Sequence, residues 1–396
     1  MNATAARILL LGAALAFAAP ACAAGLSLED AEAAAQKAWN DYADAFVEET
    51  ADELEGEAIQ AAGQTLRFKT IRFTNHVGAP CETPCAAEDG HAQPLFISLH
   101  GGGGGPAEIN DEQWQNQIGL ANTYKPADGI YLAPRAPTNE WDCWHGAGVD
   151  PLLERLIRAF VASGTVDPDR VYLMGYSAGG DGVYALSPRM ADRFAAASMM
   201  AGHPNGVSMR PLRNLPFSIQ VGADDNEYDR ANVAAEYGAR LDALQADDPE
   251  GYAHFTEIHA GKGHWMDGDD AKAVPWMEGF TRNAEPDRIV WEPTGLVHRH
   301  FYWLAVPEGQ GGSDNEIIAS RDGQTVTLSG TSGITVLVRL NDNLVDLDQP
   351  VRVVTEDGAV LFEGIAPRTT ETIEASIAAF GDYAMIYSAE VAVTLP

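Results

Sequence analysis

The sequence predicts an α/β fold, a doubly wound and mostly parallel sheet, followed by a β-sandwich-like C-terminal domain. Three observations indicate this architecture. Short apolar runs alternate with amphipathic segments from Leu95 to Thr281. Residues 170–182 read as a buried strand, a tight turn and a helix. From Glu285 onward, short β-rich runs are separated by Gly, Asp and Asn turns, which is typical of a small β-sandwich.

The length of 396 residues exceeds the usual size of one core, so we expect more than one domain. Residues 1–24 have a charged start, a short apolar run and small residues at possible cleavage sites, which is the layout of a secretory signal peptide. The predicted division is therefore a signal peptide at 1–24, a helical segment at 25–64, an α/β domain at 65–284 and a β-rich domain at 285–396. We expect a secreted or periplasmic protein.

The formal net charge is −32, from 57 acidic and 25 basic residues. Such a surface repels nucleic acid and anionic membranes, so neither is expected as a partner. No stretch after the signal peptide is apolar enough to cross a bilayer, and no stable membrane association is expected. Lipid anchoring at Cys22 is disfavoured, because Ala19 and Pro20 do not fit the residues that a lipidation signal would place before it.

Four cysteines are present, and Cys22 leaves with the signal peptide. Cys81 and Cys85 lie in a proline-flanked loop, and export to an oxidising compartment favours a local disulfide between them. The alternative is a metal site formed with His76 and His91. That spacing fits no zinc pattern well, so no metal site is expected.

The elements of the α/β domain follow from two patterns. Apolar runs bounded by Pro or Gly indicate buried strands, and apolar residues spaced three or four apart indicate helices. A capping box at Ser27 predicts a helix from Leu28 to about Glu53. Strands are then predicted at 65–73, 94–99, 130–134, 171–174, 215–222 and 255–259, and helices at 149–161, after Ser177, at 232–244 and at 274–281. The β-rich runs of the C-terminal domain are 299–306, 325–328, 334–339, 351–355 and 385–394.

The turn Gly175-Tyr176-Ser177-Ala178-Gly179 is the central motif. A Gly-x-Ser-x-Gly turn strains its serine and requires small flanking residues, which pushes the hydroxyl clear of the sheet. Five-residue matches also occur by chance around surface serines. The apolar strand before this turn and the helical pattern after it favour a nucleophile.

A glycine run follows another predicted strand. His100 and Gly101 to Gly105 leave backbone N–H groups uncovered, which is what the stabilisation of an oxyanion requires. A flexible loop is the alternative interpretation. The position of the glycine run directly after a buried strand favours an oxyanion hole.

A serine nucleophile needs a histidine base and a carboxylate that orients it. On α/β sheets with this turn the chain order is serine, acid, histidine. Asp225 and His264 occur in that order, each just after a predicted strand. Asp224 competes for the acid, and its position relative to the end of the strand favours Asp225. Among the histidines, His100, His145 and His203 are alternatives to His264 that would hydrogen-bond loops around the cleft.

Substrate contacts are predicted at the carboxyl ends of the strands, where α/β sheets bind ligands. The loop 138–145 brings two tryptophans and a histidine to such an end, although a packed loop is an equal alternative. The candidate substrate-binding residues are His100, Trp141, Trp144, His145 and Trp265.

Taken together, these segments resemble the α/β-hydrolase superfamily between about Leu66 and Arg282. Within it they are similar to secreted serine esterases of the polyhydroxybutyrate depolymerase and feruloyl esterase type, and to prolyl oligopeptidase-like hydrolases. The resemblance implies that Ser177 is the nucleophile, His264 the base and Asp225 its partner. It also implies an oxyanion hole formed by the N–H groups of Gly102 and Ala178, with Gly101 and Gly103 open as alternatives because the glycine run is longer than usual.

The expected function is that of a secreted serine hydrolase that cleaves small-molecule or polymeric carboxylic esters through an acyl-enzyme, without a metal or organic cofactor. One alternative is a secreted peptidase that uses the same residues. The other is a binding protein that kept the fold without its catalysis.

Overall fold

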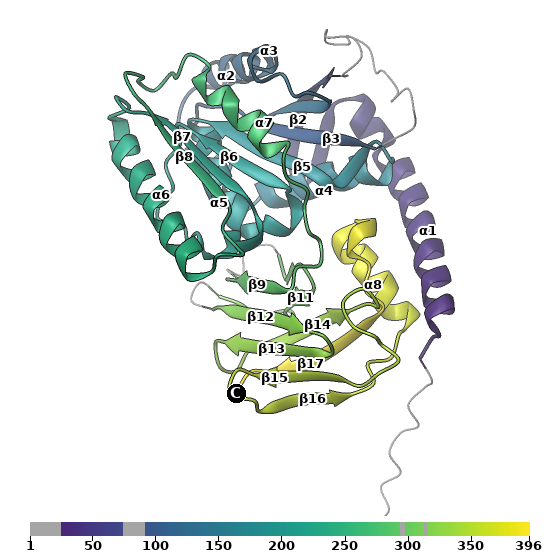
Figure 1. Ribbon diagram of the computed structural model, residues 1–396. Helices are drawn as coiled ribbons and strands as arrows, with labels where there is room; N and C mark the ends of the chain where they lie inside the picture. Colours follow the sequence, from purple (N-terminus) through teal and green to yellow (C-terminus); the bar gives the residue numbers. More distant parts are fainter. Residues whose placement is uncertain (1–24, 74–91, 294–297, 313–314) are drawn as a thin grey trace, which may run out of the picture.

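An eight-stranded sheet forms the centre of the α/β domain in this computed structural model (Figure 1). The structure describes residues 25–73, 92–293, 298–312 and 315–396. Several predictions therefore fall outside the described residues: the signal peptide, the lipid-anchor alternative at Cys22, and the loop with His76, Cys81, Cys85 and His91.

The sheet has a topological switch point at its middle. Across the sheet, the strands are β1 (Ala58–Ala61), β2 (Gln64–Phe73), β4 (Gly129–Arg135), β3 (Gln93–Leu99), β5 (Val166–Tyr176), β6 (Ala196–Met200), β7 (Phe217–Gly222) and β8 (His254–His259). From β4 to β8 all neighbours pair in parallel, whereas β1 and β2 are antiparallel. The chain winds one way after β3 and the other way after β5, and ligands bind α/β sheets at the carboxyl ends of such strands. The predicted doubly wound, mostly parallel sheet is confirmed.

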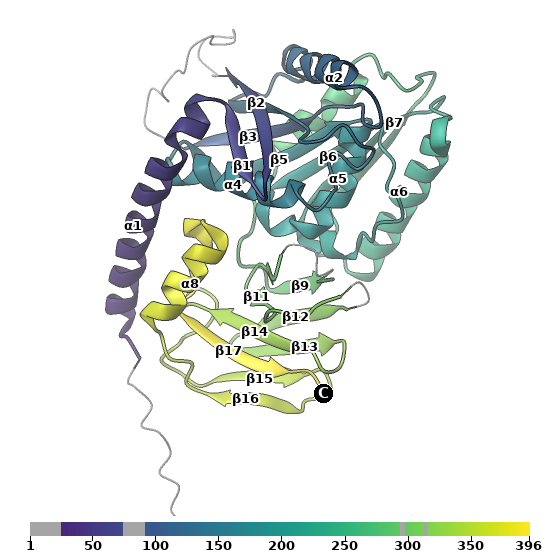
Figure 2. The same cartoon turned by 180° about the vertical axis from the view of Figure 1, so that it is seen from behind.

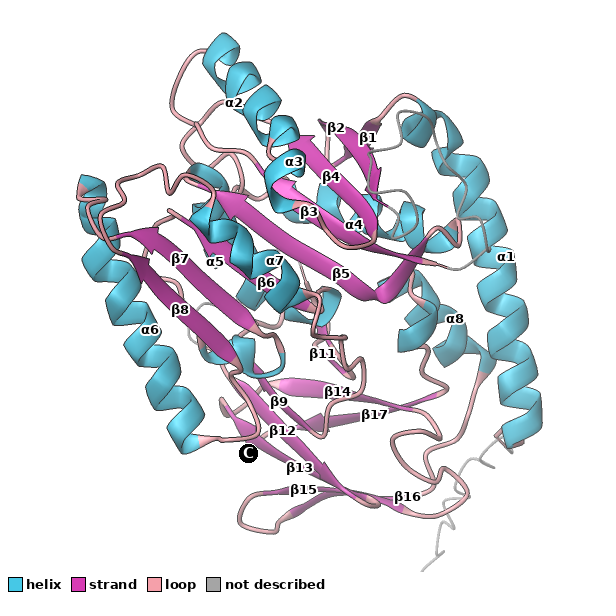
Figure 3. Cartoon of the chain, turned by 45° about the horizontal axis from the view of Figure 1, so that its top comes forward, coloured by secondary structure: helices cyan, strands magenta, loops and turns pink. Residues whose placement is uncertain are grey.

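Helices cover both faces of this sheet (Figure 3). One core contains residues of α4 (Val149–Ala162), α5 (Ala178–Arg189) and α6 (Arg230–Asp247), and the other contains residues of α2 (Ala107–Gly119), α3 (Ala121–Tyr124) and α7 (Ala273–Met277). Side chains of a strand alternate between faces, so Leu95 and Ile97 of β3 join the first core and Phe96 joins the second.

The C-terminal domain is a pair of facing sheets. One sheet contains β9 (Arg288–Trp291), β12 (Ile317–Asp322), β13 (Thr325–Gly330), β15 (Val351–Thr355) and β16 (Val360–Gly364), and the other contains β10 (His300–Phe301), β11 (Leu304–Ala305), β14 (Thr335–Leu340) and β17 (Ala389–Thr394). Every second residue of β14 is buried in the same core as alternate residues of β13, which is the packing of a β-sandwich. The predicted β-sandwich-like domain is confirmed.

Helix α1 (Leu28–Glu55) runs along the outside of both domains, and Figure 2 shows α8 (Thr370–Phe380) beside it. On the α/β side, Arg155 of α4 pairs with Glu53 at 2.8 Å. On the C-terminal side, the ring of Trp39 lies edge-on to Tyr383, with centroids 5.6 Å apart. The helix therefore contacts both domains.

Several elements differ from the sequence-based expectation. The sequence analysis missed β1, α2, α3, β6, β9, β12, β16 and α8. Helix α2 buries Asn110 and Gln117 where an apolar stripe was sought, and β6 is built largely of alanine and methionine. The expected strand at 299–306 is instead the hairpin of β10 and β11, because Tyr302 between them has φ 53°.

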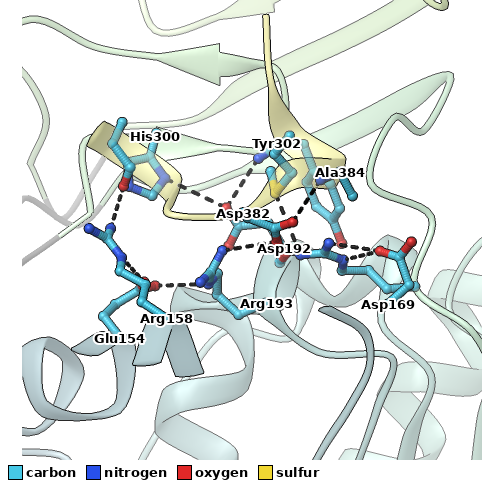
Figure 4. Close-up of polar contacts among 12 residues, drawn as sticks. Glu154, Arg158, Asp169, Asp192, Arg193, His300, Tyr302, Asp382 and Ala384 are labelled. Atoms are coloured by element: carbon cyan, nitrogen blue, oxygen red, sulfur yellow. Dashed lines mark hydrogen bonds and ion pairs between the residues drawn. The ribbon is translucent and has the colours of Figure 1, made fainter. Parts of the chain in front are cut away.

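A buried ion network joins the two domains (Figure 4). Arg282, which leads into the C-terminal domain, pairs with Asp382 at 2.8 Å and with Asp169 of β5 at 2.7 Å. Arg193, which follows α5, also pairs with Asp382, at 3.3 Å, and both side chains of this pair are 1% exposed. Burial alone would raise the pKa of Asp382, but the charges of Arg282 and Arg193 outweigh it and lower the pKa below its ordinary value.

Replacing Asp382 by Ala should lower the free energy of unfolding by about 3–5 kcal/mol, because two buried guanidinium groups lose their shared partner. Glu374→Ala on the exposed face of α8 is the matched control, with a change expected within about 0.5 kcal/mol. Urea unfolding of both variants measures the difference. Equal stabilities would show that the network does not hold the domains together.

Candidate active site

Ser177 occupies a sharp turn between β5 and α5, with φ 58° and ψ −120°. The turn is closely packed: a Cβ on Gly179 would lie 2.1 Å from the carbonyl oxygen of Leu99, and one on Gly175 would lie 2.3 Å from that of Gly179. Only glycine fits at both positions, as the motif requires. The strand, turn and helix in a mostly parallel sheet form the arrangement in which α/β-hydrolases expose a nucleophile.

Ser177, His264 and Asp225 form a continuous hydrogen-bonded chain. The Oγ atom of Ser177 lies 2.9 Å from Nε2 of His264, and Nδ1 of His264 lies 2.7 Å from Oδ2 of Asp225. Asp225 follows β7 and His264 follows β8, so all three reach the carboxyl edge of the sheet. Nδ1–H can donate to the carboxylate, which leaves Nε2 free to accept the proton of the serine.

The structure separates the two candidate acids. Asp225 is 2% exposed and faces His264, whereas Asp224 is exposed to solvent. The other carboxylate oxygen of Asp225, Oδ1, lies 3.6 Å from the guanidinium of Arg230, which is also nearly buried. The sequence analysis did not identify Arg230, because its position at the start of α6 carries no motif.

Asn110 of α2 fixes the glycine loop after β3. Its side chain is fully buried, and Oδ1 accepts a hydrogen bond of 2.7 Å from the N–H of Gly103. Its Nδ2 donates to the carbonyl oxygens of Gly105 and Pro106, at 3.3 and 3.1 Å. The N–H of Gly103 is therefore occupied, which weighs against Gly103 as an oxyanion donor. No motif pointed to Asn110 from the sequence.

Other N–H groups remain close to Ser177. Gly101 and Gly102 both line the cleft at Ser177, and a Cβ on Gly101 would lie 3.1 Å from the Cβ of the serine. The first hydrogen bond of α5 runs from the N–H of Asp181 to the carbonyl of Ser177, so the N–H of Ala178 precedes the helical ladder. The predicted donors Gly102 and Ala178 are thus adjacent to the nucleophile, and their role stays a prediction.

Two of the predicted substrate contacts are wrong. The side chains of His100 and Trp144 are both 0% exposed. The Nε2 atom of His100 accepts from the N–H of Ala136 at 3.0 Å, its Nδ1 lies 2.5 Å from the carbonyl oxygen of Gly101, and Trp144 donates to the carbonyl oxygen of His100 at 2.7 Å. These side chains hold the loops behind the site instead of facing a substrate.

The other three candidates are at least partly exposed. Trp265 is 50% exposed and lines the cleft beside His264. Trp141 is 66% exposed and packs against Gly104, and His145 is partly exposed, but neither is among the described residues that line the cleft. Their contact with a substrate stays a prediction.

The cleft above Ser177 has a volume of about 690 Å³. One wall is formed by α2 and by Leu120, which follows it. The sequence analysis did not predict this helix and therefore missed this wall. The wall and the opposite side include Ile109, Gln113, Asn116, Leu120, Tyr176 and Trp265. Among the described residues that line the cleft there is no aspartate, glutamate, lysine or arginine, so the cleft is neutral in a strongly acidic protein.

Neither a metal site nor a reactive thiol accompanies these residues in the described part of the chain. Within the described part of the chain, no group of three or more His, Cys, Asp or Glu side chains could hold a metal ion. Burial raises the pKa of the Cys143 thiol to about 12, which keeps the thiol protonated.

Among the described residues, no helix combines the length and the apolar character that a membrane span needs.

Comparison with known proteins found no matching family model and no matching curated protein. Several solved structures are similar. A thermostable esterase is 18% identical over 57% of this chain and 62% of its own, with a TM-score of 0.40, so the match spans less than two thirds of that esterase. A ferulic acid esterase is 15% identical over 55% of this chain and 94% of its own (TM-score 0.37), and a phospholipase/carboxylesterase from Dyadobacter fermentans is 16% identical over 53% and 95% (TM-score 0.36). All three TM-scores lie below 0.5, so the function proposed below depends on the geometry of the site.

The protonation of His100 should make stability depend on pH. Burial lowers the pKa of His100 from 6.5 to about 4, so between these values the unfolded chain binds a proton that the folded chain does not. The contribution of His100 to the free energy of unfolding is therefore fully present above pH 6.5. It falls as the pH drops toward 4, by up to about 1.4 kcal/mol per pH unit.

Urea unfolding of the wild type and of His100→Gln between pH 7 and pH 4.5 measures this contribution as the difference between the two slopes. The glutamine retains an acceptor for the N–H of Ala136 but does not titrate, so its slope should be smaller. Identical slopes would contradict a neutral buried imidazole at this position.

Proposed function

We propose that this protein is a serine hydrolase that cleaves carboxylic esters through an acyl-enzyme. The observation that carries the proposal is the chain of contacts from Ser177 through His264 to Asp225, at 2.9 and 2.7 Å, beside backbone N–H groups that precede a helical ladder. A serine, a base and an orienting acid in this geometry are the parts that acyl transfer requires.

In the first half of the reaction, Oγ of Ser177 attacks the carbonyl carbon of the ester while Nε2 of His264 takes the hydroxyl proton. The carbonyl oxygen gains negative charge, which the N–H groups of Ala178 and Gly102 would stabilise. Asp225 stabilises the imidazolium that forms. The intermediate then collapses, the C–O bond of the ester breaks, and His264 returns its proton to the leaving alcohol.

In the second half, water replaces the alcohol. Nε2 of His264 takes a proton from the water as its oxygen attacks the acyl carbon, and the same N–H groups stabilise the second oxyanion. Collapse releases the carboxylic acid and returns the proton to Oγ of Ser177. Every proton is carried by His264, so the chemistry needs no metal or organic cofactor.

The neutral cleft supports an uncharged substrate next to the scissile bond. The half-exposed indole of Trp265 and the apolar Ile109 offer contact area to an acyl or alcohol group, and the amides of Gln113 and Asn116 offer hydrogen bonds. We extend the proposal to small-molecule or polymeric esters with this character. The pattern of residues 1–24 supports export, so we place the reaction in the periplasm or outside the cell.

Ser177→Ala should lower kcat/KM toward p-nitrophenyl esters by about three orders of magnitude or more, because no nucleophile remains to form the acyl-enzyme. A fluorophosphonate probe should label the wild type and not the variant. Aminoacyl nitroanilides, assayed in parallel, distinguish an esterase from a peptidase. Activity that survives in Ser177→Ala would refute the serine-hydrolase mechanism.

Asp225 and its neighbour Asp224 provide a matched pair of variants. Asp225→Asn should lower kcat by about three to four orders of magnitude, because an amide does not stabilise the imidazolium and favours the wrong tautomer of His264. Asp224→Asn, one residue earlier and exposed, should leave kcat within about twofold of the wild type. Steady-state kinetics of both variants measure this, and equal losses would contradict the role of Asp225.

A further inference from the structure

The hydroxyl of Tyr176 connects the nucleophile turn to the turn that carries His264. Tyr176 is the last residue of β5 and directly precedes Ser177. Its Oη donates a hydrogen bond of 2.6 Å to the carbonyl oxygen of His264 and accepts one of 3.1 Å from the N–H of Met266. One phenol group therefore holds the main chain on both sides of Trp265.

The hydroxyl is suited to this double contact. Tyr176 is 8% exposed, and burial, followed by the negative charge of Asp270, raises the pKa of its hydroxyl above the ordinary value. The hydroxyl keeps its proton over the whole working range of an esterase, so it can donate to a carbonyl while a lone pair accepts from an amide. The main chain of Tyr176 is held by the parallel pairing of β5 with β6, in which it lies opposite Met200.

The turn around His264 has weaker support on its solvent side. Lys262 pairs with Asp267 and Asp269, each at 3.0 Å, but both carboxylates are largely exposed, and such pairs contribute little. The imidazole of His264 is itself 41% exposed. Its direction therefore depends on the contact with Asp225 and on where the main chain of His264 is held.

We propose that Tyr176 is a positioning residue, which holds the main chain of His264 so that its imidazole lies at hydrogen-bond distance from Ser177. The serine and the tyrosine are neighbours on one rigid strand end, so the same backbone fixes the nucleophile and the support of its base. A displacement of about 1 Å at a reacting group can lower a rate by up to about 100-fold, which makes this support matter for catalysis. The inference depends on the proposed hydrolase function.

The test compares Tyr176→Phe with Tyr172→Phe. Both replacements keep the ring and remove one hydroxyl. Tyr172 lies four residues earlier in β5, is fully buried, and donates to the carbonyl oxygen of Phe280 at 2.9 Å, away from the cleft. Both variants thus lose a hydrogen bond that the same strand donates to a main-chain carbonyl, and Tyr176→Phe also loses the bond accepted from the N–H of Met266.

For a p-nitrophenyl ester, Tyr176→Phe should lower kcat about tenfold or more and leave KM within about twofold, because the ring that lines the cleft is kept. The rate of fluorophosphonate labelling should fall by the same factor as kcat. Tyr172→Phe should keep both rates within about twofold, while thermal unfolding shows a small loss of stability in each variant, the larger one in Tyr176→Phe because its hydroxyl makes two hydrogen bonds.

Equal kcat values in the two variants would overturn the inference, and so would an increase in KM with kcat unchanged, which would assign the hydroxyl to substrate binding. Ser177→Ala separates these results from a failure of the proposed function. If the activity survives in Ser177→Ala, the hydrolase mechanism itself is wrong. If activity is lost there but Tyr176→Phe matches Tyr172→Phe, only the positioning role is wrong.

Discussion

The close approach of the first turn of α5 to the end of β3 is the constraint on which the site depends. A Cβ on Gly179 would lie 2.1 Å from the carbonyl oxygen of Leu99, so the helix and the strand end contact each other through backbone alone. This contact places Ser177 beside Gly101. The nucleophile and the predicted oxyanion donors are thus brought together by packing that a larger residue would disrupt.

Buried ion pairs connect the C-terminal domain to the segments on either side of Ser177. Asp169 lies on β5, before Ser177, and Arg193 follows α5, after it; both are tied through Arg282 and Asp382 to the β-sandwich (Figure 4). A buried network of this kind is costly to break, because buried charges would lose part of their compensation. The domain is therefore part of the framework of the α/β unit.

Buried polar side chains do the local positioning. Asn110 shapes the glycine loop, His100 joins the ends of β3 and β4, and Tyr176 joins the nucleophile turn to the turn of His264. Each satisfies backbone groups of irregular segments that have no partner within a helix or strand. Together they give the loops at the carboxyl edge defined positions without placing a charged side chain in the cleft.

The sequence by itself determined the alternation of strands and helices, the turn around Ser177 and the order of serine, acid and histidine, because each depends on local backbone sterics or on periodic burial. The sequence did not predict α2, because this helix buries the side-chain amides of Asn110 and Gln117 at positions where apolar residues were expected. Only the tertiary structure decided that Asp225 and not Asp224 faces His264, that His100 and Trp144 are buried, and that Asn110 and Tyr176 hold the active-site loops. Those outcomes depend on which side chains meet across segments far apart in the chain, and no local pattern encodes such contacts.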